Sequence, residues 1–66
     1  MIATLTMTDH VGRPVAGVRV KTRAIAALCA AEHHPGTEIH MQDGPPLEVA
    51  EGGLDVARVI AEAADP

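Results

Sequence analysis

The sequence has 66 residues, which leaves room for one small domain over residues 1–66. Its eighteen large aliphatic side chains (four Ile, four Leu, seven Val and three Met) come without any Phe, Tyr or Trp, so we expect a thin core. Chains of this size often depend on disulfides, a metal or a second chain. Cys29 is the only cysteine, which excludes an internal disulfide and indicates a reducing, cytoplasmic setting.

The net charge of −4 is divided unevenly along the chain. Residues 1–31 hold four cations against Asp9 and sum to +3, whereas residues 32–66 hold eight carboxylates against Arg58 and sum to −7. The acidic total and the lack of aromatic side chains disfavour nucleic-acid binding, because phosphates need cations and bases need stacking partners. The two unlike halves favour head-to-tail association.

No signal peptide or membrane segment is expected. The first residues lack a basic region followed by a long apolar run. No apolar segment approaches the roughly 20 residues that span a bilayer. We therefore expect no membrane insertion.

Two strands are predicted first in the chain. Residues 1–7 are rich in Thr, Ile and Leu, with alternating apolar positions, and residues 8–14 hold the turn formers Asp and Gly. Val15–Lys21 is the second strand, with Val18 and Val20 on one face. Arg19 and Lys21 then share the other face. If the strand continues, the spacing of two residues also places Arg23 on that face.

Residues 22–34 allow two interpretations. The stretch is Ala-rich, and propensity alone favours a helix. A turn signal at Pro35-Gly36 and a clean alternation over 37–41 favour instead a hairpin, in which Ile25–Ala31 is a strand. Local evidence leaves strand and helix nearly even.

The last third of the chain is easier to interpret. A turn over 42–46 precedes a short strand, Leu47–Val49, with Leu47 and Val49 facing inward. Leu54–Ala63 is a helix, because its apolar residues fall on one face (Val56, Val59, Ile60, Ala63).

The order of these motifs resembles that of the small flagellar proteins of the FlbD/SwrD type and their phage-encoded look-alikes. The elements that match are Met1-Ile2, Leu5-Thr6, Ile25, a Thr-x-Ile-x-Met-x-Asp-Gly hairpin over 37–44, Leu47-Glu48-Val49, Glu51 and Val56. The resemblance implies that Ile25–Ala31 is a strand. It also implies a non-enzymatic accessory role in a flagellar or a phage setting, so we expect the chain to be cytoplasmic or part of a phage particle.

Together these observations predict an α+β fold. It has a small antiparallel β-sheet of four to five strands, arranged as a meander or partly closed barrel, and one short C-terminal helix.

The basic stripe Arg19-Lys21-Arg23 is the candidate binding site. Three cations at period two would share one strand face over roughly 13 Å, at about 3.3 Å per residue. Such charges often only keep a strand solvated or guard a sheet edge. As a site, the stripe would dock an acidic partner, the chain's own acidic half, or a phosphate-bearing ligand or nucleic acid.

The remaining candidates are weaker. Cys29, His33, His34 and His40 are possible Zn²⁺ ligands around the hairpin, but their spacing fits no standard zinc motif, and we predict no metal or other cofactor. Cys29 is expected to be a small apolar residue rather than a nucleophile. Glu48 and Glu51 are expected on solvated faces rather than as an acid/base pair.

The sequence therefore predicts that the chain is not an enzyme. We expect an interaction or assembly protein that forms homo-oligomers or docks on a larger protein. The alternative is a small regulator that binds a phosphate-bearing ligand or nucleic acid through Arg19, Lys21 and Arg23.

Overall fold

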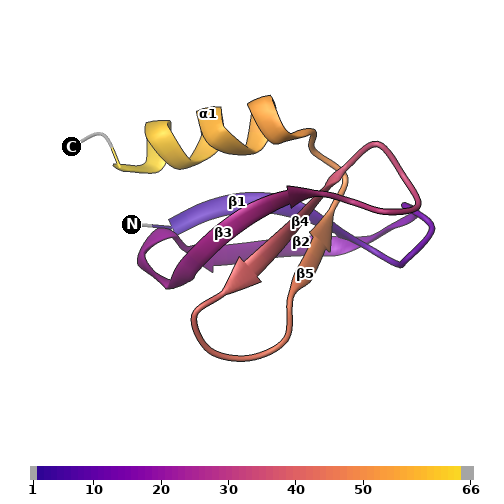
Figure 1. The fold of residues 1–66 in the computed structure, drawn as a ribbon. Helices are drawn as coiled ribbons and strands as arrows, with labels where there is room; N and C mark the ends of the chain where they lie inside the picture. Colours follow the sequence, from indigo (N-terminus) through magenta and orange to yellow (C-terminus); the bar gives the residue numbers. More distant parts are fainter. Residues whose placement is uncertain (1, 65–66) are drawn as a thin grey trace.

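A computed structural model describes residues 2–64 of the chain, so Met1 of the first predicted strand lies outside the described residues. It shows one five-stranded antiparallel sheet and one C-terminal helix (Figure 1). The predicted α+β class is confirmed. The elements in chain order are β1 (Ile2–Thr8), β2 (Pro14–Lys21), the 3-10 turn η1 (Thr22–Ala24), β3 (Ile25–Ala30), β4 (Thr37–Met41), β5 (Leu47–Val49) and α1 (Gly53–Ala64).

The strands β1 and β2 form a hairpin, as the sequence predicts. Leu5 lies opposite Val18 and Ala3 opposite Val20, so the apolar positions of both strands share the inner face. The connecting turn is closed by Asp9, whose carboxylate accepts hydrogen bonds from the backbone N–H groups of Val11 (3.1 Å) and Arg13 (2.9 Å). Asp9 and Gly12 thus act as the turn-forming residues that the sequence predicts.

The ambiguous Ala-rich stretch forms the strand β3, paired with β4 in an antiparallel hairpin. Helix propensity is worth only tenths of a kcal/mol per residue, and pairing with the amphipathic strand β4 outweighs it. Residues 22–24, however, form the 3-10 turn η1 between β2 and β3. The period-two placement of Arg23 on the same strand face as Arg19 and Lys21 was wrong, because β2 ends at Lys21.

The sheet is not a simple meander. Its order is β2-β1-β5-β4-β3, because the last strand returns to lie beside the first. Met7 pairs with Val49, and the Ala50 N–H donates to the Thr6 carbonyl oxygen at 2.9 Å. This return leaves β2 and β3 as the two edges of an open sheet.

The helix α1 covers the inner face of the sheet, where it packs on β1 and β3 (Figure 1). Val56 on its predicted apolar face is completely buried, and Val59 and Ile60 pack against the same cluster. The core is thin, as the composition predicts. Among the described residues its fully buried apolar members are Ala3, Leu5, Val20, Ile39, Val49 and Val56.

Candidate functional site

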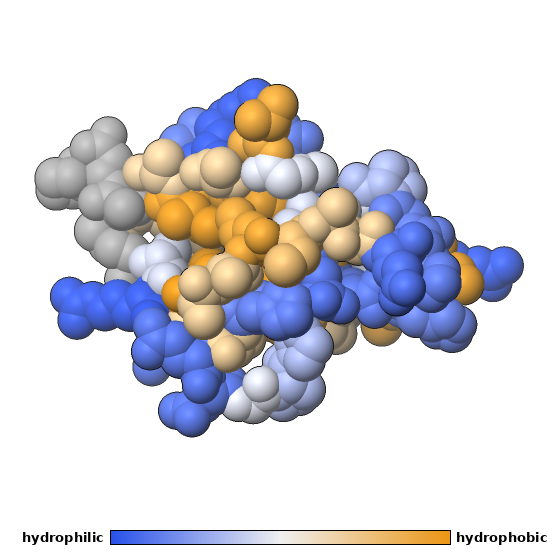
Figure 2. Space-filling view, viewed as in Figure 1, coloured by the Kyte–Doolittle hydropathy of each residue, from blue (hydrophilic) through white to orange (hydrophobic). Residues whose placement is uncertain are grey.

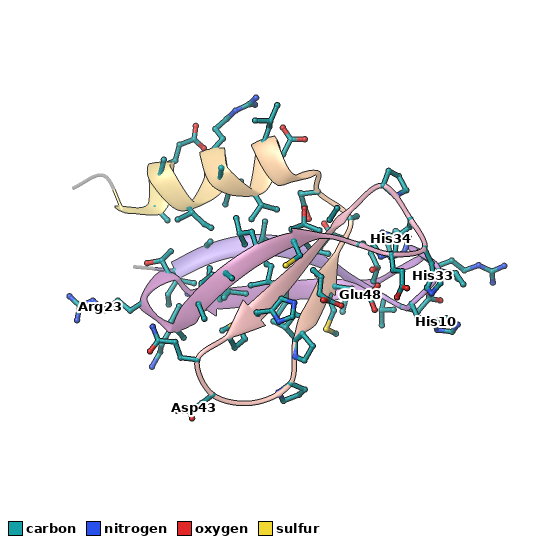
Figure 3. The ribbon with its side chains drawn as sticks, viewed as in Figure 1. His10, Arg23, His33, His34, Asp43 and Glu48 are labelled. Atoms are coloured by element: carbon teal, nitrogen blue, oxygen red, sulfur yellow. The ribbon has the colours of Figure 1, made fainter. Side chains whose placement is uncertain are left out.

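The predicted basic stripe is divided by the turn η1. Arg19 and Lys21 lie exposed on the edge strand β2, opposite Thr4 and Ile2 of β1. Arg23 projects from η1 at one end of the molecule (Figure 3). Two of the three cations therefore share a strand face, and the third extends the positive surface around the end of the sheet.

The other edge strand has the opposite character. Residues 26–30 of β3 are Ala, Ala, Leu, Cys and Ala, and all five are exposed. Figure 2 shows apolar side chains gathered across the face of the molecule where β3 runs in Figure 1, below α1. Edge strands are normally guarded by charge or proline, because their free N–H and C=O groups pair readily with other chains. Only β2 carries such guards, in Pro14, Arg19 and Lys21.

The backbone of β3 has a fixed orientation at this edge. The Ala31 N–H donates to the Gly36 carbonyl oxygen at 3.1 Å, and residues 27–30 keep one register with β4. Antiparallel strands bond to each neighbour at every second residue. The backbone groups of Ala27 and Cys29 therefore face β4, whereas those of Leu28 and Ala30 face away from the sheet.

The outer face of the sheet carries ionisable side chains. Cys29 lies opposite Glu38, and Glu38 lies opposite Glu48, so the three share this face across β3, β4 and β5. His40 also lies here, with its Nε2 2.7 Å from Glu38 Oε1. These side chains are partly solvated, and Cys29 is a free, exposed thiol.

His34 occupies a structural position that the sequence does not reveal. Its side chain is only 4% exposed, between the β3–β4 connection and β5. The Gly36 N–H donates to His34 Nδ1 at 3.1 Å, so Nδ1 is the acceptor and Nε2 carries the hydrogen that is donated to Glu48 Oε1 at 2.9 Å. His34 thus ties a turn to a strand.

Two glycines make room for the His34 ring. A Cβ on Gly12 would lie 2.6 Å from His34 Cβ, and Gly12 also has φ +91°, which favours glycine. A Cβ on Gly36 would overlap the Val49 carbonyl oxygen. The β1–β2 turn, the β3–β4 connection and β5 therefore meet around one imidazole (Figure 3).

The histidines considered as candidate metal ligands each have a separate carboxylate neighbour. His34 pairs with Glu48, His40 pairs with Glu38, and the exposed His33 lies 3.7 Å from Glu32. Within residues 2–64, no three His, Cys, Asp or Glu side chains are placed to hold a metal ion.

Glu51 binds backbone rather than substrate. Its two carboxylate oxygens accept the Thr6 N–H at 3.0 and 3.1 Å, and its carbonyl oxygen accepts the Thr37 hydroxyl at 2.8 Å. The Glu51 side chain therefore extends the short hydrogen-bonded contact between β1 and β5 by binding a backbone N–H of β1. Glu48 has a different partner, because its Oε1 lies 2.9 Å from His34 Nε2.

Asp9 is the described group with a clear pKa shift. The pKa of its carboxyl lies below the ordinary value, chiefly because the Arg13 backbone N–H stabilises the carboxylate, with a smaller contribution from the Val11 N–H. Both hydrogen bonds lie within an exposed turn, so the lowered pKa reflects turn geometry rather than a catalytic environment.

Comparisons with protein-family models, curated proteins and solved structures find no match to this chain. The resemblance to flagellar FlbD/SwrD-type proteins therefore stays a prediction. Along residues 2–64, no helix is both long and apolar enough to cross a membrane.

Proposed function

We propose that the chain is a non-enzymatic interaction or assembly protein, which acts by homo-oligomerisation or by docking on a larger protein. The observation that carries the proposal is the edge strand β3. It presents exposed small apolar side chains and outward-facing backbone groups without a guarding charge. Adding a strand to such an edge is a common mode of protein recognition.

The chemistry of the polar side chains supports a binding role. His34, Glu48 and Glu51 are hydrogen-bonded to the protein's own backbone or to each other. Each of these contacts positions a turn or a strand. They build a scaffold for a surface rather than a reacting centre.

The setting we propose is cytoplasmic or within a phage particle, as a flagellar or phage accessory protein. The support for it is the order of motifs that resembles the FlbD/SwrD type.

Sedimentation at several protein and salt concentrations tests the proposal. We expect the chain to associate, with an average mass that rises with protein concentration, because a thin core and an open edge both gain from contact with another chain. A sample that stays monomeric when concentrated and still unfolds cooperatively at high temperature would oppose it.

A second candidate function rests on Arg19 and Lys21. Both are exposed on one face of β2, and the ion pairs recorded within residues 2–64 do not involve them. Such a surface suits a phosphate-bearing ligand or nucleic acid. A gel shift with a single-stranded oligonucleotide that disappears in high salt, and in a Lys21→Glu variant, would favour this alternative.

A further inference from the structure

We infer that the partner of β3 is a second copy of this chain, joined through antiparallel pairing of the two β3 strands across a two-fold axis at Leu28. This inference rests on the proposed function and specifies which strand of each copy forms the contact. The pairing would extend the five-stranded sheet into one continuous sheet across both copies.

The backbone of β3 is suited to this pairing. The N–H and C=O groups of Leu28 face away from β4, so two Leu28 residues from facing strands can exchange both hydrogen bonds. The bulge in β3 lies between Ile25 and Ala27, and the four residues 27–30 run in regular register. A regular outward edge is therefore available on both sides of the axis.

The side chains of β3 are self-complementary. In a register centred on Leu28, each Cys29 lies opposite an Ala27 of the other copy, and the two Leu28 side chains lie side by side. Leu28 is 37% exposed in the single chain, and this contact would cover it. No like charges meet, since residues 25–30 are all uncharged.

The charges that flank β3 have opposite signs at its two ends. Arg23 precedes Leu28 by five positions, and Glu32 follows it by four. In the register centred on Leu28, position 23 of one copy lies opposite position 33 of the other, so Arg23 of one copy comes within one residue of Glu32 of the other. Both side chains are exposed, so they are available for two symmetric ion pairs at the rim.

The edge strand β2 is a poor alternative for self-pairing. Two antiparallel β2 strands would bring Arg19 and Lys21 of one copy toward the same cations of the other, which repel. Pro14 also lacks the N–H that a ladder uses. A head-to-tail contact between β2 of one copy and β3 of the next avoids this repulsion. A test of the β3–β3 pairing therefore has to separate it from this head-to-tail contact.

Disulfide trapping in the full chain makes that distinction. An Ala27→Cys variant would place a new thiol opposite Cys29 of the other copy. These residues form a non-hydrogen-bonded pair with Cα atoms about 4.5 Å apart, within the range that a disulfide bridges. We expect mild oxidation to convert most of this variant to covalent dimer, at concentrations where the native chain, with Cys29 alone, converts at least tenfold more slowly.

A Gly17→Cys variant is the matched control, because Gly17 is exposed on the outer face of the other edge strand, the same face that carries Cys29, and a Cβ there meets open space. A ladder of covalent oligomers from this variant, with little dimer from Ala27→Cys, would establish the head-to-tail contact and overturn the inference.

A charge placed on β3 supplies an independent readout. Ala27→Lys adds a cation to an exposed position on the outer face, so the fold should be retained by circular dichroism. We expect it to reduce the sedimenting mass to that of one chain, whereas Ala16→Lys leaves the dimer intact. Association that is unchanged by Ala27→Lys would refute the β3 contact but leave the proposed function standing. A native chain that is monomeric throughout would oppose both this inference and the homo-oligomerisation part of the proposed function.

Discussion

Replacing His34 by alanine tests whether this residue holds the loops and β5 together. The substitution removes the acceptor of the Gly36 N–H and the donor to Glu48. Each hydrogen bond contributes about 1 kcal/mol, and a buried N–H left unpaired costs about 1 kcal/mol or more. Since Glu48 is 28% exposed, water can replace its lost partner. The expected loss in the free energy of unfolding is about 2–3 kcal/mol.

A loss of that size is large for this chain. A single core in a domain this small rarely supplies more than about 3–5 kcal/mol. At about 4–8 °C per kcal/mol, the midpoint of thermal unfolding should fall by about 8–24 °C. The assay is far-UV circular dichroism, because the chain has no Trp or Tyr to report by fluorescence.

Two further variants sharpen the test. His33→Ala removes a neighbouring histidine that is 63% exposed, and it should change stability by less than about 0.5 kcal/mol. His34→Asn retains an oxygen near the Nδ1 position and should recover part of the loss, because Asn accepts the N–H two residues on in turns. All samples need the same protein concentration, since association shifts the midpoint. Equal melting of His34→Ala and His33→Ala would refute the reasoning.

Three other predictions follow from the contacts. Gly36→Ala forces a Cβ into the carbonyl oxygen of Val49 and should prevent folding or lower the free energy of unfolding by more than about 3 kcal/mol. Gly17→Ala meets open space and should leave stability unchanged. The yield of soluble protein and the midpoint of thermal unfolding of the two variants test this. Glu51→Ala should cost about 1–2 kcal/mol in chemical denaturation, because it strips both acceptors from a β1 amide, and the exposed Glu62→Ala on α1 should cost nothing measurable. The folded-state pKa of Asp9 is lowered, so its stabilisation is present above the ordinary pKa and is lost as the pH falls through the folded value; Asp9→Asn should flatten the acid side of the stability profile, and an unchanged profile would contradict this.

Much of the fold follows from local patterns in the sequence. The alternation over Thr37–Met41 and Leu47–Val49 places Ile39 and Val49 in the core, where both are completely buried. The spacing of Val56, Val59 and Ile60 likewise identifies the buried face of α1. These elements are predictable because one face of each is apolar and the other is polar.

The strand β3 was harder to predict for a physical reason. It is an edge strand with no polar face, so its sequence lacks the alternation of apolar and polar residues that identifies a strand. Its alanines also favour a helix. The same uncharged run is the signal for the exposed edge. That signal becomes interpretable only when the sheet order shows β3 has one neighbour.

The candidate site depends on contacts that are remote in sequence. The pair between His34 and Glu48 spans 14 residues and exists because β3, β4 and β5 are adjacent. Glu51 and Thr6 are 45 residues apart and meet because β5 returns to β1. Local patterns specify each strand but not these pairings. The sequence analysis also failed to predict the turn that contains Arg23. The spacing of the three cations gives no signal that the strand ends at Lys21.

Amide hydrogen exchange within β3 tests the central claim most directly. The Cys29 N–H is bonded to β4, whereas the N–H groups of Leu28 and Ala30 face the sheet edge. If a second copy covers this edge, the Leu28 amide should exchange nearly as slowly as that of Cys29 in a concentrated sample, and much faster after dilution. Rapid exchange at Leu28 at every concentration, with Cys29 protected, would show that no chain pairs with β3.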